Sequence, residues 1–386
     1  MRIALVSWEY PPVVVGGLGA HVDGLSRAFA RAGHDVVVLT RAHPYAPGDE
    51  EVEGVRVLRA HTDLPWVAPD DPVAAVASGN HALVKAAGRL GSWVPDVVHA
   101  HDWLGAWAGD TLRGLWDVPL VATVHATEMG RHQGRLFTAV SQTINAVEWW
   151  LTYQAQRVIC CSRYMVEEVL ATFQLPADKV DMVPNGVEVQ RWRPAAPPGP
   201  SDHPTIVSWG RLEYEKGFQT LLGAVARLRP EFPELRAVVV GRGSYADELR
   251  GQSRELGVDD VVRFAGFVPD DELVAMLAAA ACAVIPSLYE PFGIVALEAM
   301  AAGAPLVAAA AGGLREVLEG TGAGLLYPPG DVADLADAVR TMLLDDGLRT
   351  ISRRIGHDLV ATRYSWDAVA ARTIDTYAAA RGAALG

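Results

Sequence analysis

The chain has 386 residues, a length that allows two or three domains. Half of its residues are hydrophobic and 20% are charged, which excludes a disordered or collagen-like chain. The formal net charge is −13 and there is no dense run of Lys and Arg, so neither a nucleic-acid binder nor an anionic-membrane binder is expected.

The sequence shows neither a membrane-spanning segment nor a cysteine pattern typical of disulfides or metal sites. No apolar run approaches the roughly 20 residues of a membrane-spanning helix, and the run at Ile3–Val6 is too short for the core of a signal peptide. Two of the three cysteines, Cys160 and Cys161, are adjacent and cannot begin a disulfide framework or a metal knuckle. We expect a cytoplasmic, reduced protein with no bound metal and no stable membrane insertion.

In the first half of the chain, short apolar runs alternate with helical stretches, a pattern typical of α/β folds. The strands are predicted at Ile3–Ser7, Asp35–Thr40, Val55–Arg59, Asp96–His99, Leu120–Val124, Val158–Cys161 and Val180–Val183. The helices are predicted at Ala20–Ala32, Pro72–Leu90, Leu104–Leu115 and Tyr164–Thr172. Continuous apolar strands such as Val36–Leu39 fit a parallel sheet that is covered on both faces.

A proline-rich segment follows at 191–204. Five prolines between Pro194 and Pro204 cannot continue a helix or a central strand, so this segment is predicted to be a linker.

Beyond the linker, the same alternation of strands and helices resumes. The strands are predicted at Thr205–Trp209, Ala237–Val240, Val261–Phe264, Cys282–Ile285, Pro305–Ala308 and Gly324–Tyr327. The helices are predicted at Phe218–Leu228, Tyr245–Leu256, Asp271–Ala279, Ile294–Ala302, Leu314–Glu319 and Val332–Leu344, with two more between Leu348 and Ala384.

These elements predict two doubly wound domains, residues 1–190 and 205–362, with a last helical segment at 363–386. Sheets of this kind bind ligands at the carboxyl ends of their strands. Two facing domains therefore suggest one active site in the cleft between them, and a cleft that closes excludes water.

The first candidate loop contains Gly16 and Gly17 between a strand and a helix. Glycines there allow a phosphate or sugar to approach the backbone, and the helix start favours an anion. The Gly-Gly-Leu-Gly spacing is not the dinucleotide-binding fingerprint. On its own, the loop is equally consistent with a plain tight turn.

Two polar clusters follow predicted strands, His99–Trp103 and Thr123–Glu128. Either cluster alone fits structural histidines in a loop, whereas two clusters at strand ends of one sheet favour a site. A zinc site made of His99, His101 and His125 is conceivable, but it is disfavoured because no pair has a helical ligand spacing.

Charged residues also follow the first strand after the linker. Arg211 and Lys216 are five residues apart in one loop, where a guanidinium fork and an ammonium could clamp a diphosphate. The plainer alternative is a solvated loop in which Glu213 and Glu215 pair with these bases.

The most specific motif runs from Glu290 to Glu298. Gly293 allows the chain to turn closely under a ligand, and the N–H groups of Gly293, Ile294 and Val295 open a helix, a ready anion site. Glu298 lies more than one turn inside an apolar helix, so it needs a hydrogen-bond partner, for which ribose hydroxyls are suited. A capped helix with Glu298 in solvent is the alternative.

Together these motifs resemble the family 4 retaining glycosyltransferases, the glycogen-synthase-like group with the GT-B fold of two Rossmann-like domains. The resemblance covers nearly the whole chain, and Arg-x4-Lys with Glu-x7-Glu is its specific part. Within the family, the chain is most similar to bacterial α-1,4-glucosyltransferases that act on glucans, including actinobacterial enzymes for glycogen or methylglucose polysaccharides. The resemblance also implies a last helix that crosses back to the first domain.

The resemblance implies a role for each matching residue. Arg211 and Lys216 would hold the diphosphate of a nucleotide-sugar donor, and Glu290 would contact the transferred sugar. The backbone of Gly293–Val295 would bind sugar and phosphate, and Glu298 would accept from the ribose hydroxyls. On the first domain, His125 would touch the primary hydroxyl of the sugar, and Asp102 would lie on the acceptor side.

The implied reaction is transfer of glucose from ADP- or UDP-glucose to an α-1,4-glucan acceptor, with retention and without a metal or cofactor. Val14 stands where many bacterial glycogen synthases have Lys, which weakens a strict assignment to ADP-glucose. A GDP-mannose-dependent mannosyltransferase acting on a lipid or glycoside acceptor is the rival within the family. A sugar-nucleotide epimerase is the rival from another class.

Overall fold

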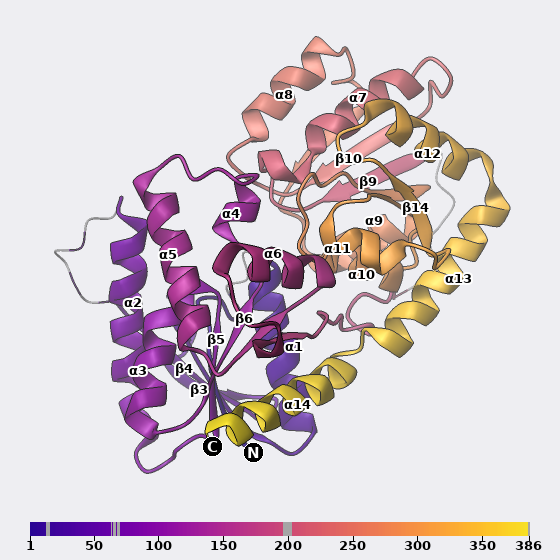
Figure 1. Cartoon of the computed structure of the whole chain (residues 1–386). Coiled ribbons are helices and arrows are strands. Elements are labelled where there is room, and N and C mark those ends of the chain that lie inside the picture. The colour runs from indigo at the N-terminus through magenta and orange to yellow at the C-terminus, as the bar shows by residue number, and fades with distance from the viewer. Residues whose placement is uncertain (13–15, 63, 65–66, 68–69, 196–202, 385–386) are drawn as a thin grey trace. The chain divides into compact units, whose positions relative to one another are not determined.

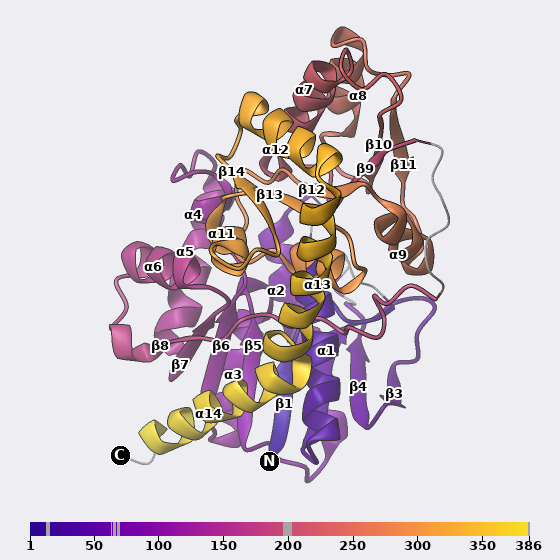
Figure 2. The ribbon, with the colours of Figure 1, turned by 90° about the vertical axis from the view of Figure 1, so that its right-hand side faces the viewer.

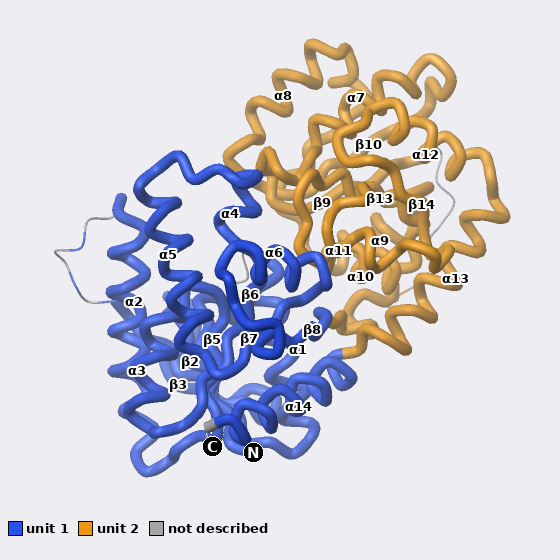
Figure 3. The backbone as a smooth tube through the Cα atoms, viewed as in Figure 1, with its two compact units in different colours: residues 1–185, 366–386 blue, residues 186–365 orange. Residues whose placement is uncertain are grey.

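The computed structural model describes residues 1–12, 16–62, 64, 67, 70–195 and 203–384. The chain forms two compact units, Met1–Asn185 with Trp366–Gly386, and Gly186–Ser365 (Figure 3). Residues 196–202 of the predicted linker and the Val14 position lie outside the described residues. Each unit has its own sheet and its own hydrophobic core.

The first unit contains an eight-stranded sheet in the order β3-β4-β2-β1-β5-β6-β7-β8. Every neighbouring pair is parallel except β3 with β4. The strands are β1 (Arg2–Val6), β2 (Asp35–Arg41), β3 (Asp49–Val52), β4 (Val55–Ala60), β5 (Val97–His101), β6 (Leu120–Val124), β7 (Arg157–Cys160) and β8 (Val180–Met182). The parallel sheet predicted from the continuous apolar strands is confirmed.

The helices of the first unit include one from the far end of the chain. They are α1 (Gly17–Arg31), α2 (Pro72–Ala87), η1 (Gly88–Leu90), η2 (Trp103–Gly105), α3 (Ala106–Trp116), α4 (Glu128–Arg131), α5 (Ala139–Gln154), α6 (Arg163–Phe173), η3 (Ala177–Lys179) and α14 (Trp366–Ala384). Helix α14 packs beside α1 (Figure 2). Tyr377 from α14 is fully buried, and its ring lies against that of Phe29 on α1.

The second unit contains a six-stranded, fully parallel sheet in the order β11-β10-β9-β12-β13-β14, of which Figure 1 labels β9, β10 and β14. Its strands are β9 (Thr205–Trp209), β10 (Arg236–Val240), β11 (Val262–Gly266), β12 (Cys282–Ile285), β13 (Leu306–Ala309) and β14 (Gly324–Tyr327). Its helices are η4 (Tyr214–Lys216), α7 (Phe218–Leu228), α8 (Ala246–Glu255), α9 (Asp270–Ala279), α10 (Ile294–Ala301), α11 (Gly312–Leu318), α12 (Val332–Leu344) and α13 (Asp346–Arg363).

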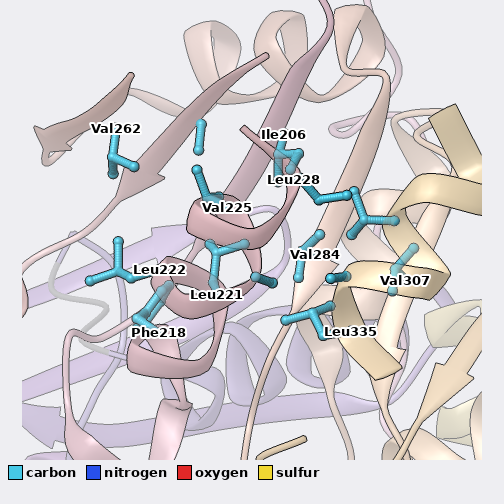
Figure 4. Packing of buried hydrophobic residues seen from close by; sticks show 14 of the residues in the cluster. Ile206, Phe218, Leu221, Leu222, Val225, Leu228, Val262, Val284, Val307 and Leu335 are labelled. Atoms are coloured by element: carbon cyan, nitrogen blue, oxygen red, sulfur yellow. The ribbon is translucent and has the colours of Figure 1, made fainter. Parts of the chain in front are cut away.

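The core of the second unit shows why its sequence folds this way. On α7, Phe218, Leu221 and Val225 recur at helical spacing and are all buried, so one face of the helix is apolar. Figure 4 shows this face turned toward Ile206 and Val284 from the central strands. Burying each such side chain contributes about 1.5–3 kcal/mol, and this anchors the loops at the strand ends.

Three elements differ from the sequence prediction. Strand β3 was not expected because its acidic residues have low strand propensity; it pairs only with β4, through a tight turn at Glu53-Gly54. Helices α4 and α5 were also not expected. The α5 segment mixes β-branched, aromatic and polar residues without a clear apolar stripe.

None of the described helices is both long enough and apolar enough to cross a membrane.

Candidate active site

In the second unit, the loops that follow β9 and β12 are held against each other. The backbone N–H of Leu288 donates to the Glu215 carbonyl at 2.8 Å. Gly217 has a φ of +70°, and a Cβ there would lie 1.9 Å from the Pro286 carbonyl oxygen, so only glycine allows this approach. The contact places the residues before Gly217 beside those after Pro286.

Lys216 and Glu290 meet at this junction. The Lys216 Nζ atom donates to the Glu290 Oε2 atom at 2.7 Å, and the Ser287 hydroxyl donates to the same oxygen at 3.1 Å. The side chains of Lys216 and Glu290 are only 20% and 11% exposed, respectively. A partly buried, charge-assisted hydrogen bond of this kind fixes both side chains more firmly than a surface ion pair does.

The start of α10 lies next to Glu290. Gly293 has a φ of +92°, and a Cβ there would lie 2.4 Å from Leu314 Cδ2, so the turn requires glycine. The Gly313 N–H donates to the Glu290 carbonyl at 2.9 Å and ties α11 to this turn. As in any helix, the N–H groups of the first turn, here at Ile294 and Val295, have no intrahelical acceptor, and they favour an anion.

Glu298 follows one turn later on α10 and is partly buried. Its Oε2 atom accepts from the Trp209 indole N–H at 3.1 Å. Burial raises the pKa of Glu298 to about 7, although the hydrogen bond from Trp209 favours the charged form. The carboxyl is therefore not a solvated surface group, and its charge changes near neutral pH.

Arg211 differs from these residues in its exposure. Its side chain is 45% exposed, and its guanidinium donates to Glu215 Oε1 at 3.4 Å. This long, solvent-screened contact leaves the side chain room to turn toward a ligand.

In the first unit, Asp102 and His125 follow β5 and β6. The Asp102 carboxylate accepts from the His125 backbone N–H at 2.7 Å and also from Ala126. Asp102 is buried with a φ of +54°, a strained conformation for a residue other than glycine, and burial raises its pKa to about 6. Asp102 thus fixes the turn that carries His125.

The His125 ring is packed among other rings. Its Nε2 atom lies 3.2 Å from His101 Nδ1, and the two rings are stacked. Burial, with a smaller effect from Arg131, lowers the pKa of His125 to about 3. The ring is neutral at physiological pH, so it can both donate and accept a hydrogen bond.

The glycine loop of the first unit is described from Gly16 onward. The Gly16 N–H donates to the Glu9 carboxylate at 3.2 Å, and Gly17 is the first residue of α1. The N–H groups of this helix start are oriented as an anion site requires, as at α10.

Comparisons with known proteins identify the family of the chain. A family model described as Glycosyltransferase Family 4 matches residues 15–191, and one described as Glycosyl transferases group 1 matches residues 191–356. A glycogen synthase from Mycobacterium tuberculosis is 43% identical, over 99% of this chain and 95% of the relative. A D-inositol 3-phosphate glycosyltransferase from Corynebacterium aurimucosum is 32% identical over 98% of this chain and 96% of the relative.

The chain belongs to glycosyltransferase family 4. Solved structures confirm the GT-B fold. A sucrose-phosphate synthase from Thermosynechococcus elongatus superposes with a TM-score of 0.83 at 27% identity, covering 98% of each chain. The catalytic domain of starch synthase IV from Arabidopsis thaliana superposes with a TM-score of 0.80 at 18% identity, covering 99% of each chain.

The structure brings some of the predicted residues of this glycosyltransferase together. Lys216 bonds directly to Glu290, and Asp102 bonds directly to the backbone of His125. Glu298 bonds to Trp209, a partner that the sequence did not suggest. The histidines also group differently from the set considered above. One nitrogen each from His21, His101 and His125 lies within 4.8 Å of the others, a set without His99.

Sequence reasoning missed three residues that support these sites. His21 lies on the buried face of α1, which also carries the polar residues Asp23 and Ser26. Ser287 lies three residues before Glu290 and donates to it. Glu148 accepts twice from the Glu128 N–H, at 3.0 and 3.1 Å, and burial raises its pKa to about 8. Since Glu148 lies in the unpredicted α5, only His21 and Ser287 carried a readable signal.

Proposed function

We propose that this glycosyltransferase transfers glucose from ADP- or UDP-glucose to an α-1,4-glucan acceptor, with retention of the anomeric configuration. The observation that carries the proposal is the 43% identity to a glycogen synthase over nearly the full length of both chains. The identity to D-inositol 3-phosphate glycosyltransferases is lower, at 32%, over a similar coverage.

In the second unit, the proposed roles follow from charge. Lys216 and Arg211 bind the diphosphate of the donor, and the α10 start adds the N–H groups of Ile294 and Val295. Cleavage of the sugar–phosphate bond leaves negative charge on the nucleoside diphosphate. Stabilising that developing charge is usually the largest catalytic effect available to a site.

Glu290 has a double role in this proposal. Its Oε2 atom holds the Lys216 ammonium, and its Oε1 atom accepts from hydroxyls of the transferred sugar. The carboxylate thereby couples the position of the sugar to the cation that faces the leaving group. Gly293 keeps the backbone close beneath the sugar, and Glu298 accepts from the ribose hydroxyls.

In the first unit, the proposed contacts are to uncharged groups. His125, neutral at pH 7, bonds the primary hydroxyl of the sugar. Asp102 serves the acceptor side by fixing the loop of His125. Gly16 and Gly17 allow the donor to approach the N–H groups in the first turn of α1, while the Gly16 N–H itself donates to Glu9. Attack by the acceptor on the face that the phosphate leaves gives retention.

We propose that transfer needs no divalent metal ion. The sequence contains no Asp-x-Asp pair to hold a divalent cation, and Arg211 and Lys216 supply the positive charge instead. Transfer rates measured after EDTA treatment and after added Mg²⁺ are expected to be the same. Loss of activity in EDTA that Mg²⁺ restores would contradict this part of the proposal.

The function is tested with a matrix of donors and acceptors. ADP-glucose, UDP-glucose, GDP-glucose and GDP-mannose are each incubated with malto-oligosaccharides, with D-inositol 3-phosphate, or with no acceptor. Nucleotide release and chain extension are both measured. We expect glucan extension with ADP- or UDP-glucose, and a product that an α-1,4-specific exo-glucosidase digests.

Each alternative has its own signature in the same matrix. Extension with GDP-mannose alone would identify the mannosyltransferase. Transfer only to the inositol phosphate would identify a small-acceptor enzyme. Conversion of the donor sugar without an acceptor and without release of nucleotide would identify an epimerase.

A further inference from the structure

Three histidines converge in the first unit, from α1, β5 and the loop after β6. One ring nitrogen each from His21, His101 and His125 lies within 4.8 Å of the other two. His21 and His101 are buried and His125 is partly buried. Zn²⁺ prefers imidazole nitrogens and thiolates as ligands, and a compact group of imidazoles can bind it.

The hydrogen bonds of His21 leave a definite nitrogen for a ligand. Its Nδ1 atom pairs with Asn185 Oδ1 at 2.8 Å, so Nδ1 carries the proton and Nε2 carries the lone pair. Among the described residues, the buried Nε2 atom has no hydrogen-bond partner. A histidine whose second nitrogen donates to a carbonyl oxygen is the arrangement that fixes metal-ligating imidazoles.

The other two rings already have the spacing of metal ligands. His101 Nδ1 and His125 Nε2 face each other at 3.2 Å. Two nitrogens that bind one tetrahedral Zn²⁺ at roughly 2.0–2.1 Å lie about 3.3 Å apart. One of these two facing nitrogens carries the shared proton. If that proton moves to the other nitrogen of its own ring, both facing nitrogens have a free lone pair and each ring stays neutral. Among the described residues, the buried Nε2 atom of His101 also has no partner, so it can take that proton.

The neighbouring polar groups do not compete for this role. His99 is saturated, since its Nδ1 pairs with Tyr377 and its Nε2 with Thr123, each at 2.7 Å. Asp102 faces the backbone of His125. The His21 ring is also packed edge-on against Trp366, with 5.3 Å between the two centroids, and an indole has no lone pair to offer a metal ion.

We propose that His21, His101 and His125 form a binding site for Zn²⁺, with a water molecule completing a tetrahedral set of ligands. A small rotation of the His21 ring brings the third nitrogen into the coordination shell. Zinc bound here occupies His125 and prevents its contact with the donor sugar. Zinc therefore inhibits transfer reversibly, a consequence that rests on the role of His125 in the proposed function.

The site is tested on the full chain after removal of any polyhistidine tag and after treatment with a chelator. Zn²⁺ binding is measured by titration calorimetry, and Co²⁺ is used to record the visible ligand-field absorption of a tetrahedral complex. We expect one ion per chain. His21→Gln and His101→Gln should each weaken Zn²⁺ binding by roughly tenfold or more. His132→Gln, a partly exposed histidine outside the cluster, is the matched control and should bind as the unmodified chain does.

The experiment tests two statements: that the three histidines bind Zn²⁺, and that bound Zn²⁺ inhibits transfer. Absent zinc binding, or equal binding by the unmodified chain and by both cluster variants, overturns the site. Circular dichroism of the two variants confirms that they fold, and either variant suffices for the test. Stoichiometric binding that the variants lose, together with inhibition by Zn²⁺ that EDTA reverses, supports both statements. Binding without inhibition supports the site but contradicts the role of His125 in transfer.

Discussion

The two units handle their polar groups in opposite ways. In the first unit, His99 and His101 are fully buried, and burial holds the pKa of each well below its usual value, so they are neutral. In the second unit, Lys216 and Glu290 keep opposite charges, directly bonded and still in contact with solvent. The candidate site of the first unit therefore offers neutral imidazoles beside the Asp102 carboxyl, and that of the second unit offers an ion pair.

The proposed function gives this difference a use, because it assigns parts of a nucleotide sugar to each kind of group. Hydroxyl groups of a sugar both donate and accept hydrogen bonds, and a neutral imidazole can do the same. A diphosphate needs cations and helix N–H groups, which the junction of Lys216 and α10 supplies. The contrast can be broken by removing charge from the second unit or hydrogen bonds from the first.

The largest effect is expected for Lys216→Ala. Because the charge on the leaving diphosphate grows toward the transition state, turnover should fall about 100- to 1000-fold, as for the loss of one oxyanion donor, while donor affinity changes little. Steady-state kinetics with varied donor measure both quantities. Arg227→Ala, which removes an exposed cation from α7 of the same unit, is the control and should be nearly unchanged. An unaltered turnover with a raised KM would reduce Lys216 to a binding residue.

A smaller effect is expected for Glu298→Gln. If the carboxylate accepts from ribose hydroxyls, the amide should weaken binding by about 1.5–3 kcal/mol, the usual cost of losing a hydrogen bond to a charged group. Because the proposed function places the sugar at Glu290 and the Gly293 turn, the nucleoside diphosphate and the intact sugar nucleotide should lose the same amount. Titration calorimetry of both ligands measures this.

Glu319→Gln, an exposed carboxylate on the same unit, serves as the control for Glu298→Gln. Loss for the sugar nucleotide alone would place Glu298 at the sugar and not at the ribose.

The sequence predicted the sheets well because their strands carry continuous apolar runs. Every predicted strand is present, whereas the acidic β3 was missed. It is stabilised by its ladder with β4 and by the bond between Arg59 and Glu50, and such pairing depends on tertiary structure. Helix α5 was missed for a similar reason. Its buried Glu148 accepts a hydrogen bond from the N–H of Glu128, twenty residues earlier in the chain, and no local pattern predicts this contact.

The candidate site was predictable in its residue types but not in its pairings. The motifs placed Lys216 and Glu290 at strand ends, where parallel sheets bind ligands. Their 2.7 Å contact joins residues 74 positions apart, which no local pattern encodes. The need of Glu298 for a partner could be inferred from its apolar helix, but Trp209 could not. His21 comes from α1, far from the other two histidines in sequence, and only the tertiary fold packs its ring against those of His101 and His125.

A stability test on the first unit uses Tyr377→Phe. The Tyr377 hydroxyl is fully buried and lies 2.7 Å from His99 Nδ1, so its removal leaves a buried imidazole nitrogen unpaired. The free energy of unfolding should fall by about 1–3 kcal/mol, measured by urea denaturation. Tyr45→Phe, at an 89% exposed position, should have no measurable effect. An unchanged stability in Tyr377→Phe would show that the neutral network does not depend on this bond.

The smallest expected effect is a pH dependence that belongs to the second unit. The pKa of Glu298 is raised to about 7, so the carboxyl is mostly protonated at pH 6 and mostly ionised at pH 8. A raised carboxyl pKa means that its contribution to folding stability is present below about pH 4.5 and is lost as the pH rises through 7.

Donor binding responds with the opposite sign, because only the ionised carboxylate accepts from both ribose hydroxyls and the Trp209 indole. The affinity for an intact sugar nucleotide, whose phosphates do not titrate in this range, should rise by up to about tenfold from pH 6 to pH 8. Titration calorimetry across this range should show the rise in the unmodified chain and a flat profile in Glu298→Gln. The same rise in both proteins would assign the titration to another group and would remove Glu298 from the donor site.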